Sequence, residues 1–177
     1  MVPYVVASAS RLTVKSLTIQ LESSESFTHG SLYLGALVQA GDPHIVLILA
    51  MDNQVGYKYH IRVTAETPYW HYEFKREKIS NNMVLSTLLR IHDVSAGALN
   101  PTDLDGLLSK LTVPVGREWG ECFPWVIRAV QALHDAKLVS LVSTSGLREE
   151  LEKFASGNRA YARRDLFPNT KVSEFCA

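Results

Sequence analysis

Apolar and polar residues alternate with a period of two through much of the first half of the chain, which is typical of half-buried β-strands. The alternation is clearest over 56–64, where tyrosine, isoleucine and valine separate lysine, histidine and arginine. Segment 44–51 is apolar at almost every position, which predicts a strand buried on both faces and joined to 56–64 by a hairpin. We expect further strands over 5–7, 12–21, 31–40 and 69–75.

The apolar spacing then changes to that of helices, with leucine, isoleucine and valine recurring every three or four residues. Thr102 is the expected N-cap of one helix, and Pro124 suits the first turn of another, where a missing N–H leaves no bond unmade. Segment 111–120 contains a proline and two glycines and is expected to be irregular. The predicted helices run over 82–91, over 103–111, from 124 to about 138, and from Ser145 or Gly146 to about 163.

Strands followed by helices predict an α+β fold, in which an antiparallel sheet from the N-terminal half packs against helices from the C-terminal half. The chain has 177 residues, 46% of them hydrophobic, which suits a single globular domain. We assign residues 1–165 to this domain and expect 166–177 to form a weakly held tail.

Charge and cysteine content narrow the functional classes. Eighteen basic residues balance eighteen acidic ones, so the chain lacks the basic excess that nucleic acids or anionic membranes attract. Two cysteines do not make a disulfide framework, and the longest apolar run, 45–51, is too short to span a bilayer. We expect a cytoplasmic protein that acts on a small molecule, without a metal or other cofactor, nucleic acid or membrane as partner; its oligomeric state stays open.

Cys122 is the leading candidate for chemistry, because it lies where the irregular segment gives way to a helix. A helix N-terminus lowers the pKa of a thiol and offers free N–H groups that could stabilise an oxyanion. Glu121 opposes this, since a neighbouring carboxylate disfavours a thiolate. The alternative is that Cys122 is a small buried hydrophobic residue.

His44 opens the most apolar strand and is the natural general base for a thiol. His60 is the candidate third member of the site, orienting His44, and the register of the hairpin decides whether it can. A two-residue turn points the two histidines to opposite faces, whereas a three-residue loop brings them to the same face. The alternative for His60 is solvent exposure beside Lys58 and Arg62.

Aromatic residues are the candidates for the walls of an apolar substrate pocket. They flank Cys122 or cluster in the strand expected over 69–75. No cysteine and histidine spacing matches a zinc site, and no glycine-rich phosphate loop or G-x-S-x-G segment occurs. The candidate substrate-binding residues are Trp119, Trp125, Trp70, His71 and Tyr72.

The segment Gly120-Glu121-Cys122-Phe123-Pro124-Trp125-Val126, with His44 opening a strand upstream, resembles the circularly permuted papain-like superfamily. That superfamily includes lecithin–retinol acyltransferase-like proteins and small relatives of NlpC/P60 peptidases. The chain also looks like a group of small fungal proteins with a Gly-x-Cys-x-x-Trp-Val segment. It departs from the acyltransferases in having Glu121 where they have asparagine, and in the long spacing from His44 to His60.

The resemblance implies a papain-like arrangement with Cys122 as nucleophile and His44 as base. The expected reaction is acyl transfer or hydrolysis of an amide, ester or thioester. Two alternatives stay open. One is a non-covalent cyclase or isomerase of natural-product biosynthesis that uses a histidine on the same scaffold, and the other is a binding module without chemistry.

Overall fold

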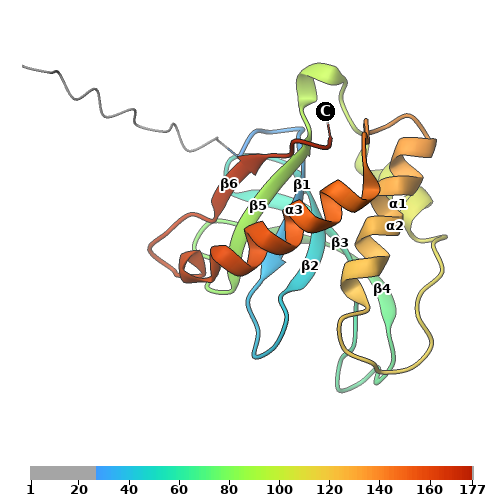
Figure 1. Cartoon of the computed structure of the whole chain (residues 1–177), viewed down its shortest axis with the longest axis vertical. Coiled ribbons are helices and arrows are strands. Elements are labelled where there is room, and N and C mark those ends of the chain that lie inside the picture. Colours follow the sequence, from blue (N-terminus) through green and yellow to red (C-terminus); the bar gives the residue numbers. More distant parts are fainter. Residues whose placement is uncertain (1–26, 177) are drawn as a thin grey trace, which may run out of the picture.

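The computed structural model describes residues 27–176, which form a six-stranded sheet with helices on one face (Figure 1). The strand order is β4-β3-β2-β1-β5-β6, antiparallel throughout except for the parallel pair β5 and β6. The α+β prediction is therefore confirmed at this level. The strands are β1 (Leu32–Leu37), β2 (His44–Ala50), β3 (Val55–Arg62), β4 (His71–Lys78), β5 (Leu85–His92) and β6 (Asn169–Val172).

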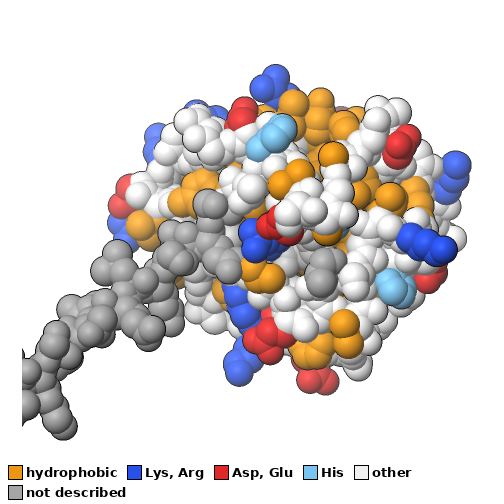
Figure 2. All heavy atoms as spheres, turned by 90° about the horizontal axis from the view of Figure 1, so that it is seen from above, with side chains coloured by type: hydrophobic (Ala, Val, Ile, Leu, Met, Phe, Trp, Pro, Cys, Tyr) orange, Lys and Arg blue, Asp and Glu red, His pale blue; other side chains and the backbone are white. Residues whose placement is uncertain are grey.

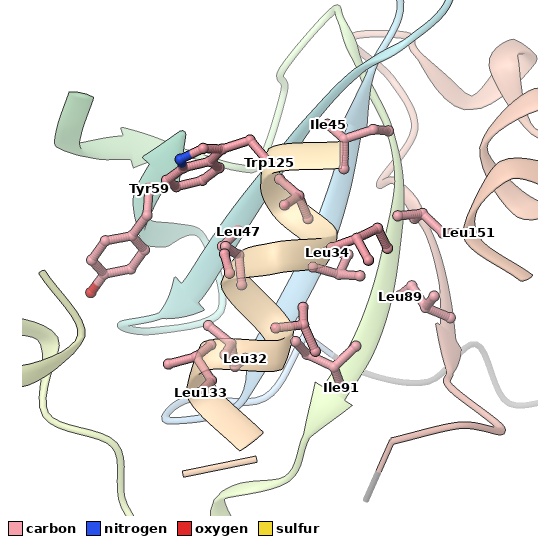
Figure 3. Packing of buried hydrophobic residues seen from close by; sticks show 14 of the residues in the cluster. Leu32, Leu34, Ile45, Leu47, Tyr59, Leu89, Ile91, Trp125, Leu133 and Leu151 are labelled. Carbon is pink, nitrogen blue, oxygen red and sulfur yellow. The ribbon is translucent and has the colours of Figure 1, made fainter. Parts of the chain in front are cut away.

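Three helices from the second half of the chain cover one face of the sheet. They are α1 (Pro101–Leu108), α2 (Cys122–Asp135) and α3 (Thr144–Gly157), and the 3₁₀ turns η1 (Val94–Ala96) and η2 (Arg159–Tyr161) lie in the connections. Figure 3 shows Trp125 and Leu133 of α2 over Leu32, Leu34 and Leu47 of the sheet. All five side chains are fully buried, so the main core lies between α2 and the central strands.

The opposite face of the sheet has a smaller core of its own. Because β4 and β5 are not neighbours, the connection between them crosses the sheet, and Ile79 at its start packs with Val46, Ile48 and Leu88. The crossing ends beside β1, where the Val38 N–H donates to the Val84 carbonyl at 2.7 Å. This second core covers parts of β1, β2 and β5 on the face away from the helices.

The helix expected over 82–91 is wrong, since this segment forms strand β5. β5 is paired on both edges, with β1 and with β6, and is buried along most of its length. A strand buried on both faces has no alternation of polar residues, and its leucines then match helical spacing.

The prediction of a weakly held tail over 166–177 is also wrong for the residues of this segment that the structure describes. Asn169–Val172 adds β6 to the sheet, and the Cys176 side chain is only 6% exposed. The Glu150 carboxylate of α3 holds this segment, because it accepts hydrogen bonds from Lys171 Nζ at 2.8 Å and Ser173 Oγ at 2.7 Å. The strands expected over 5–7 and 12–21 lie outside the described residues.

The first two helix starts differ in detail from prediction. The N-cap of α1 is Asn100, not Thr102, and its side-chain oxygen accepts from the Thr102 and Asp103 N–H groups. Pro101 occupies the first turn of that helix. α2 begins at Cys122 with Pro124 in its first turn, as expected, and no side chain caps its N-terminus. The sulfur atom thus lies at the mouth of a fourteen-residue helix.

Candidate functional site

Three loops meet at one end of the sheet and enclose a cavity of about 610 Å³. They are the β1–β2 loop, the β3–β4 loop and the segment leading into α2, all at the lower end of Figure 1. The Arg159 guanidinium braces the first loop, donating to the Gln39 carbonyl at 2.7 Å and the Gly41 carbonyl at 3.0 Å. The Trp70 indole braces the third, donating to the Glu118 carbonyl at 3.1 Å.

The cavity contains the three residues predicted to be catalytic. Cys122, His44 and His60 all line it, although they come from α2, β2 and β3. The remaining lining residues are Leu37, Val38, Gln39, Lys58, Arg62, Val63, Trp70, Glu77, Val84, Arg117, Trp119 and Gly120.

His44 and His60 are hydrogen-bonded, with His44 Nε2 at 2.8 Å from His60 Nδ1. Leu47 pairs with Tyr59, so His60 comes opposite Val46 and shares a sheet face with His44. Ala50 and Gly56 are the last paired residues of this hairpin, so five residues separate them, a length that neither predicted register used. It has the same parity as the three-residue loop, and His60 is buried with 3% of its surface exposed.

Glu73 on β4 continues the chain of contacts. It pairs with His60 across the β3–β4 ladder, and its Oε2 lies 2.8 Å from His60 Nε2. Arg62 Nη1 and Lys75 Nζ approach the same oxygen at 3.4 Å and 3.3 Å. The Glu73 carboxylate on β4 therefore orients the His60 imidazole on β3, which in turn contacts the His44 imidazole on β2.

These contacts determine which ring nitrogens carry protons. A carboxylate only accepts hydrogen bonds, so His60 Nε2–H donates to Glu73 and His60 Nδ1 is left as an acceptor. His44 Nε2–H then donates to His60 Nδ1. The basic lone pair of His44 is therefore on Nδ1, which has no hydrogen-bond partner within residues 27–176. The chain ends in a nitrogen that can accept a proton.

Burial and nearby cations keep both imidazoles neutral. Burial, with the positive charges of Lys58 and Arg62, lowers the pKa of His44 to about 4. Burial and Lys58 likewise lower the pKa of His60 to about 3, although the Glu73 carboxylate opposes this. Desolvation raises the pKa of Glu73, but hydrogen bonds from His60 and Lys75 outweigh it and bring the pKa to about 2. At neutral pH the arrangement is an ionised carboxylate followed by two neutral imidazoles.

The Cys122 thiol lies against the first residues of β2. The backbone N–H groups of Ile45, the residue after His44, and of Cys122 and Phe123 favour the thiolate form. The side chain is 2% exposed, and burial raises the thiol pKa more than these three donors lower it. The expectation of a lowered pKa is wrong in this state, because desolvation outweighs the field of the helix. In the described part of the chain, no hydrogen bond joins the thiol to His44.

The aromatic residues predicted to bind substrate divide into two groups. Trp70 and Trp119 line the cavity, and Trp119 is 86% exposed at its rim. Trp125, Tyr72 and His71 do not line it. Trp125 is fully buried with its ring centroid 5.9 Å from that of Tyr72, and the Tyr72 hydroxyl donates to Asp105 at 2.8 Å. Trp125 is a core residue because its place one turn into α2 faces the sheet.

Sequence reasoning missed the charged residues of the site. Glu73, Lys58, Arg62 and Glu77 come from adjacent strands on the face away from the helices, and Lys58 Nζ contacts the Glu77 carboxylate. Lys58, His60 and Arg62 share one face by their period of two, a signal that was visible but was equally consistent with solvent exposure. Only the β3–β4 register identifies Glu73 as the partner of His60.

Residues 27–176 contain neither a metal-binding cluster nor a membrane-spanning helix. No group of three histidine, cysteine, aspartate or glutamate side chains in this range is arranged to hold a metal ion. No helix in it is long and apolar enough to cross a membrane. Comparison of the chain with protein-family models, curated proteins and solved structures finds no match, so the papain-like resemblance stays a prediction.

Proposed function

We propose that this protein catalyses acyl transfer or hydrolysis, with Cys122 as nucleophile and His44 as general base, on a circularly permuted papain-like scaffold. One observation carries the proposal: the Glu73–His60–His44 chain ends in a free basic nitrogen within the cavity that contains Cys122. A nucleophile, a base and a group that orients the base are the minimal apparatus of covalent acyl transfer.

The first step balances with a neutral thiol and a neutral imidazole. As Sγ of Cys122 bonds to the carbonyl carbon of an amide, ester or thioester, its proton passes to Nδ1 of His44. The carbonyl oxygen becomes an oxyanion. The N–H groups of Ile45, Cys122 and Phe123 lower the pKa of the thiol, so we assign them to stabilise the charge that develops beside the sulfur.

The remaining steps return the protein to its starting state. The oxyanion collapses, the bond to the leaving group breaks, and His44 gives its proton to the departing amine, alcohol or thiol. Water or a second nucleophile then loses a proton to His44 and attacks the thioester, releasing the acyl product and restoring the Cys122 thiol. Glu73 and His60 act as positioning residues, since they hold His44 in the tautomer that leaves Nδ1 free.

Acylation by a simple activated ester tests the nucleophile directly. The protein is incubated with 4-nitrophenyl butyrate, nitrophenolate release is followed, and the adduct is mapped by mass spectrometry. We expect one butyryl group on Cys122, none in Cys122→Ala, and acylation slowed by roughly 10²- to 10⁴-fold in His44→Ala. Cys176→Ala is the matched control and keeps wild-type acylation.

The outcome against the proposal is equally specific. Unchanged nitrophenolate release by Cys122→Ala, with a melting curve like that of the wild type, removes Cys122 as nucleophile. Equal labelling of Cys122 and Cys176 reduces the reaction to the background chemistry of thiols.

The raised pKa of Cys122 favours a second candidate function. A buried protonated thiol without a hydrogen bond to His44 also fits a non-covalent cyclase or isomerase, in which His44 alone moves the proton and Cys122 packs. That enzyme would keep its activity in Cys122→Ala and lose it in His44→Ala. The covalent enzyme, in contrast, would lose its activity in Cys122→Ala.

A further inference from the structure

We infer that the cavity selects acyl compounds that carry a second, anionic group, a carboxylate or a phosphate, held by Arg117 together with Lys58 and Arg62. The inference rests on the proposed function for the reacting acyl group, but the anion site follows from the charges of the cavity alone. Those charges stand out because the whole chain is neutral.

The cavity wall has an excess of positive charge. Its ionised lining residues are Lys58, Arg62, Arg117 and Glu77, three cations against one carboxylate, while its two histidines are neutral. A cleft lined by one sign of charge concentrates ligands of the opposite sign. The opposite end of the molecule, seen in Figure 2, instead carries basic and acidic side chains interspersed.

Arg117 is the cation that is free to bind a ligand. It lies on the loop before α2 between two glycines with positive φ, Gly116 at 115° and Gly120 at 87°. Within residues 27–176 its guanidinium has no hydrogen-bond or ion-pair partner, although it lines the cavity. A planar guanidinium with its donors unused matches a carboxylate or a phosphate in two parallel hydrogen bonds.

The other two cations are incompletely neutralised. Arg62 reaches Glu73 only at 3.4 Å and shares that carboxylate with His60 and Lys75. Lys58 is buried against Glu77, and its charge still lowers the pKa of both histidines. An anion beside Lys58 and Arg62 therefore counters the same field and makes His44 a stronger base.

The apolar part of the wall completes the description of the ligand. Leu37, Val38 and Val63 line the cavity with Trp70 and Trp119. A ligand that contacts both the cationic and the apolar residues of the wall has a short apolar chain between its acyl group and its anionic group.

Binding to a variant without the nucleophile tests this inference without turnover. Titration calorimetry on Cys122→Ala compares monomethyl suberate, which carries one carboxylate, with dimethyl suberate, which is neutral. We expect the monoester to bind at least about 10-fold more tightly, with an affinity that falls as salt is added. Octyl phosphate and octanoate, titrated in parallel, show whether phosphate or carboxylate is preferred.

Arginine variants assign the effect to the cavity. Arg117→Gln in the Cys122→Ala background is expected to weaken monomethyl suberate about 3- to 10-fold and leave dimethyl suberate unchanged. Arg164→Gln removes the same charge from an exposed position that does not line the cavity, and should change neither affinity. Equal affinity for the two esters, no binding of either, or equal effects of the two arginine variants overturns the anion site. Tight monoester binding without any Cys122 acylation leaves the anion site standing and removes the covalent function.

Discussion

The two faces of strands β2 and β3 have opposite chemistry although they share one backbone. On the helix side, Ile45, Leu47, Tyr59 and Ile61 belong to the main core under α2. On the other side, Val46 and Ile48 join the smaller apolar core, whereas His44, His60 and Lys58 make polar contacts that extend to Glu73 and Glu77 of β4. The helix face stabilises the fold through apolar burial, and the opposite face combines a smaller apolar core with ionised and neutral polar groups in fixed geometry.

This comparison separates residues that hold the molecule together from residues that set its chemistry. Cys122 is the exception, because it belongs to the main core and also lines the cavity. The site is thus built where the apolar layer ends and the polar layer begins. Variants on the helix face should therefore lose stability, whereas variants of the polar groups on the opposite face should lose proton transfer.

The largest effect is expected from Trp125→Ala on the helix face. Removing this fully buried ring should lower the free energy of unfolding by about 3–5 kcal/mol, since a cavity remains in the core. Guanidinium denaturation measures it. Trp119→Ala, at an 86% exposed site, is the control and should change stability by no more than about 0.5 kcal/mol. A small effect at Trp125 would restore it as a candidate for substrate binding.

Glu73→Gln on the opposite face should slow Cys122 acylation by roughly 10- to 100-fold, an effect of about 1.4–2.7 kcal/mol. An amide can donate to His60 Nε2 and reverse the tautomers of both histidines, so that Nδ1 of His44 loses its lone pair. The pH profile of acylation by 4-nitrophenyl butyrate checks this. Glu66→Gln, exposed in the β3–β4 loop, is the control. A uniform loss in both variants would reduce Glu73 to a structural role.

Acid should destabilise the protein through the two histidines. Their pKa values in the folded state, about 4 and about 3, lie below the unfolded value of 6.5, so the unfolded state takes up protons first. Stability is full above pH 6.5 and falls toward pH 4 by about 1.4 kcal/mol per pH unit for each histidine. Urea midpoints at pH 7 and pH 4.5 measure the loss. The double variant His44→Gln, His60→Gln should lose less over this interval, and an equal loss contradicts the assignment.

The smallest effect concerns the alkylation of Cys122. Because burial raises its pKa, iodoacetamide should react slowly at pH 7 and faster as the pH rises above 9, with Cys176→Ala removing the second thiol. Cys176, whose pKa burial raises to about 12, should be slower still in Cys122→Ala. Fast alkylation of Cys122 below pH 7 would show a thiolate formed in the free protein and would replace the general-base step with a preformed ion pair.

Much of this architecture was accessible from local pattern, and the exceptions have physical reasons. A continuous apolar run identified β2 and alternation identified β3, while Pro124 after an irregular segment placed the start of α2 within two residues of Cys122. β5 was missed because a strand paired on both edges and buried on both faces shows no period of two. Short-range pattern cannot reveal β6, whose partner strand is far away in sequence.

The residues of the site were also predictable only in part. His44, His60 and Cys122 were identified by residue type and by position at the ends of elements. Glu73 was not, because a glutamate in an amphipathic strand looks like any exposed residue until the register pairs it with His60. The thiol pKa was predicted in the wrong direction because a sequence shows the start of a helix but not how deeply it is buried.

The late position of β6 also has a consequence for folding during synthesis. β5 lies between β1 and β6, and within residues 27–176 its outer edge is paired by β6, which leaves the ribosome after α1, α2 and α3. Until then, the nascent chain presents a leucine-rich strand with unpaired backbone groups, the kind of edge that recruits other chains. Polypeptides stalled before Asn169 are therefore expected to associate with one another or with chaperones, even though every residue of the cavity has already been made.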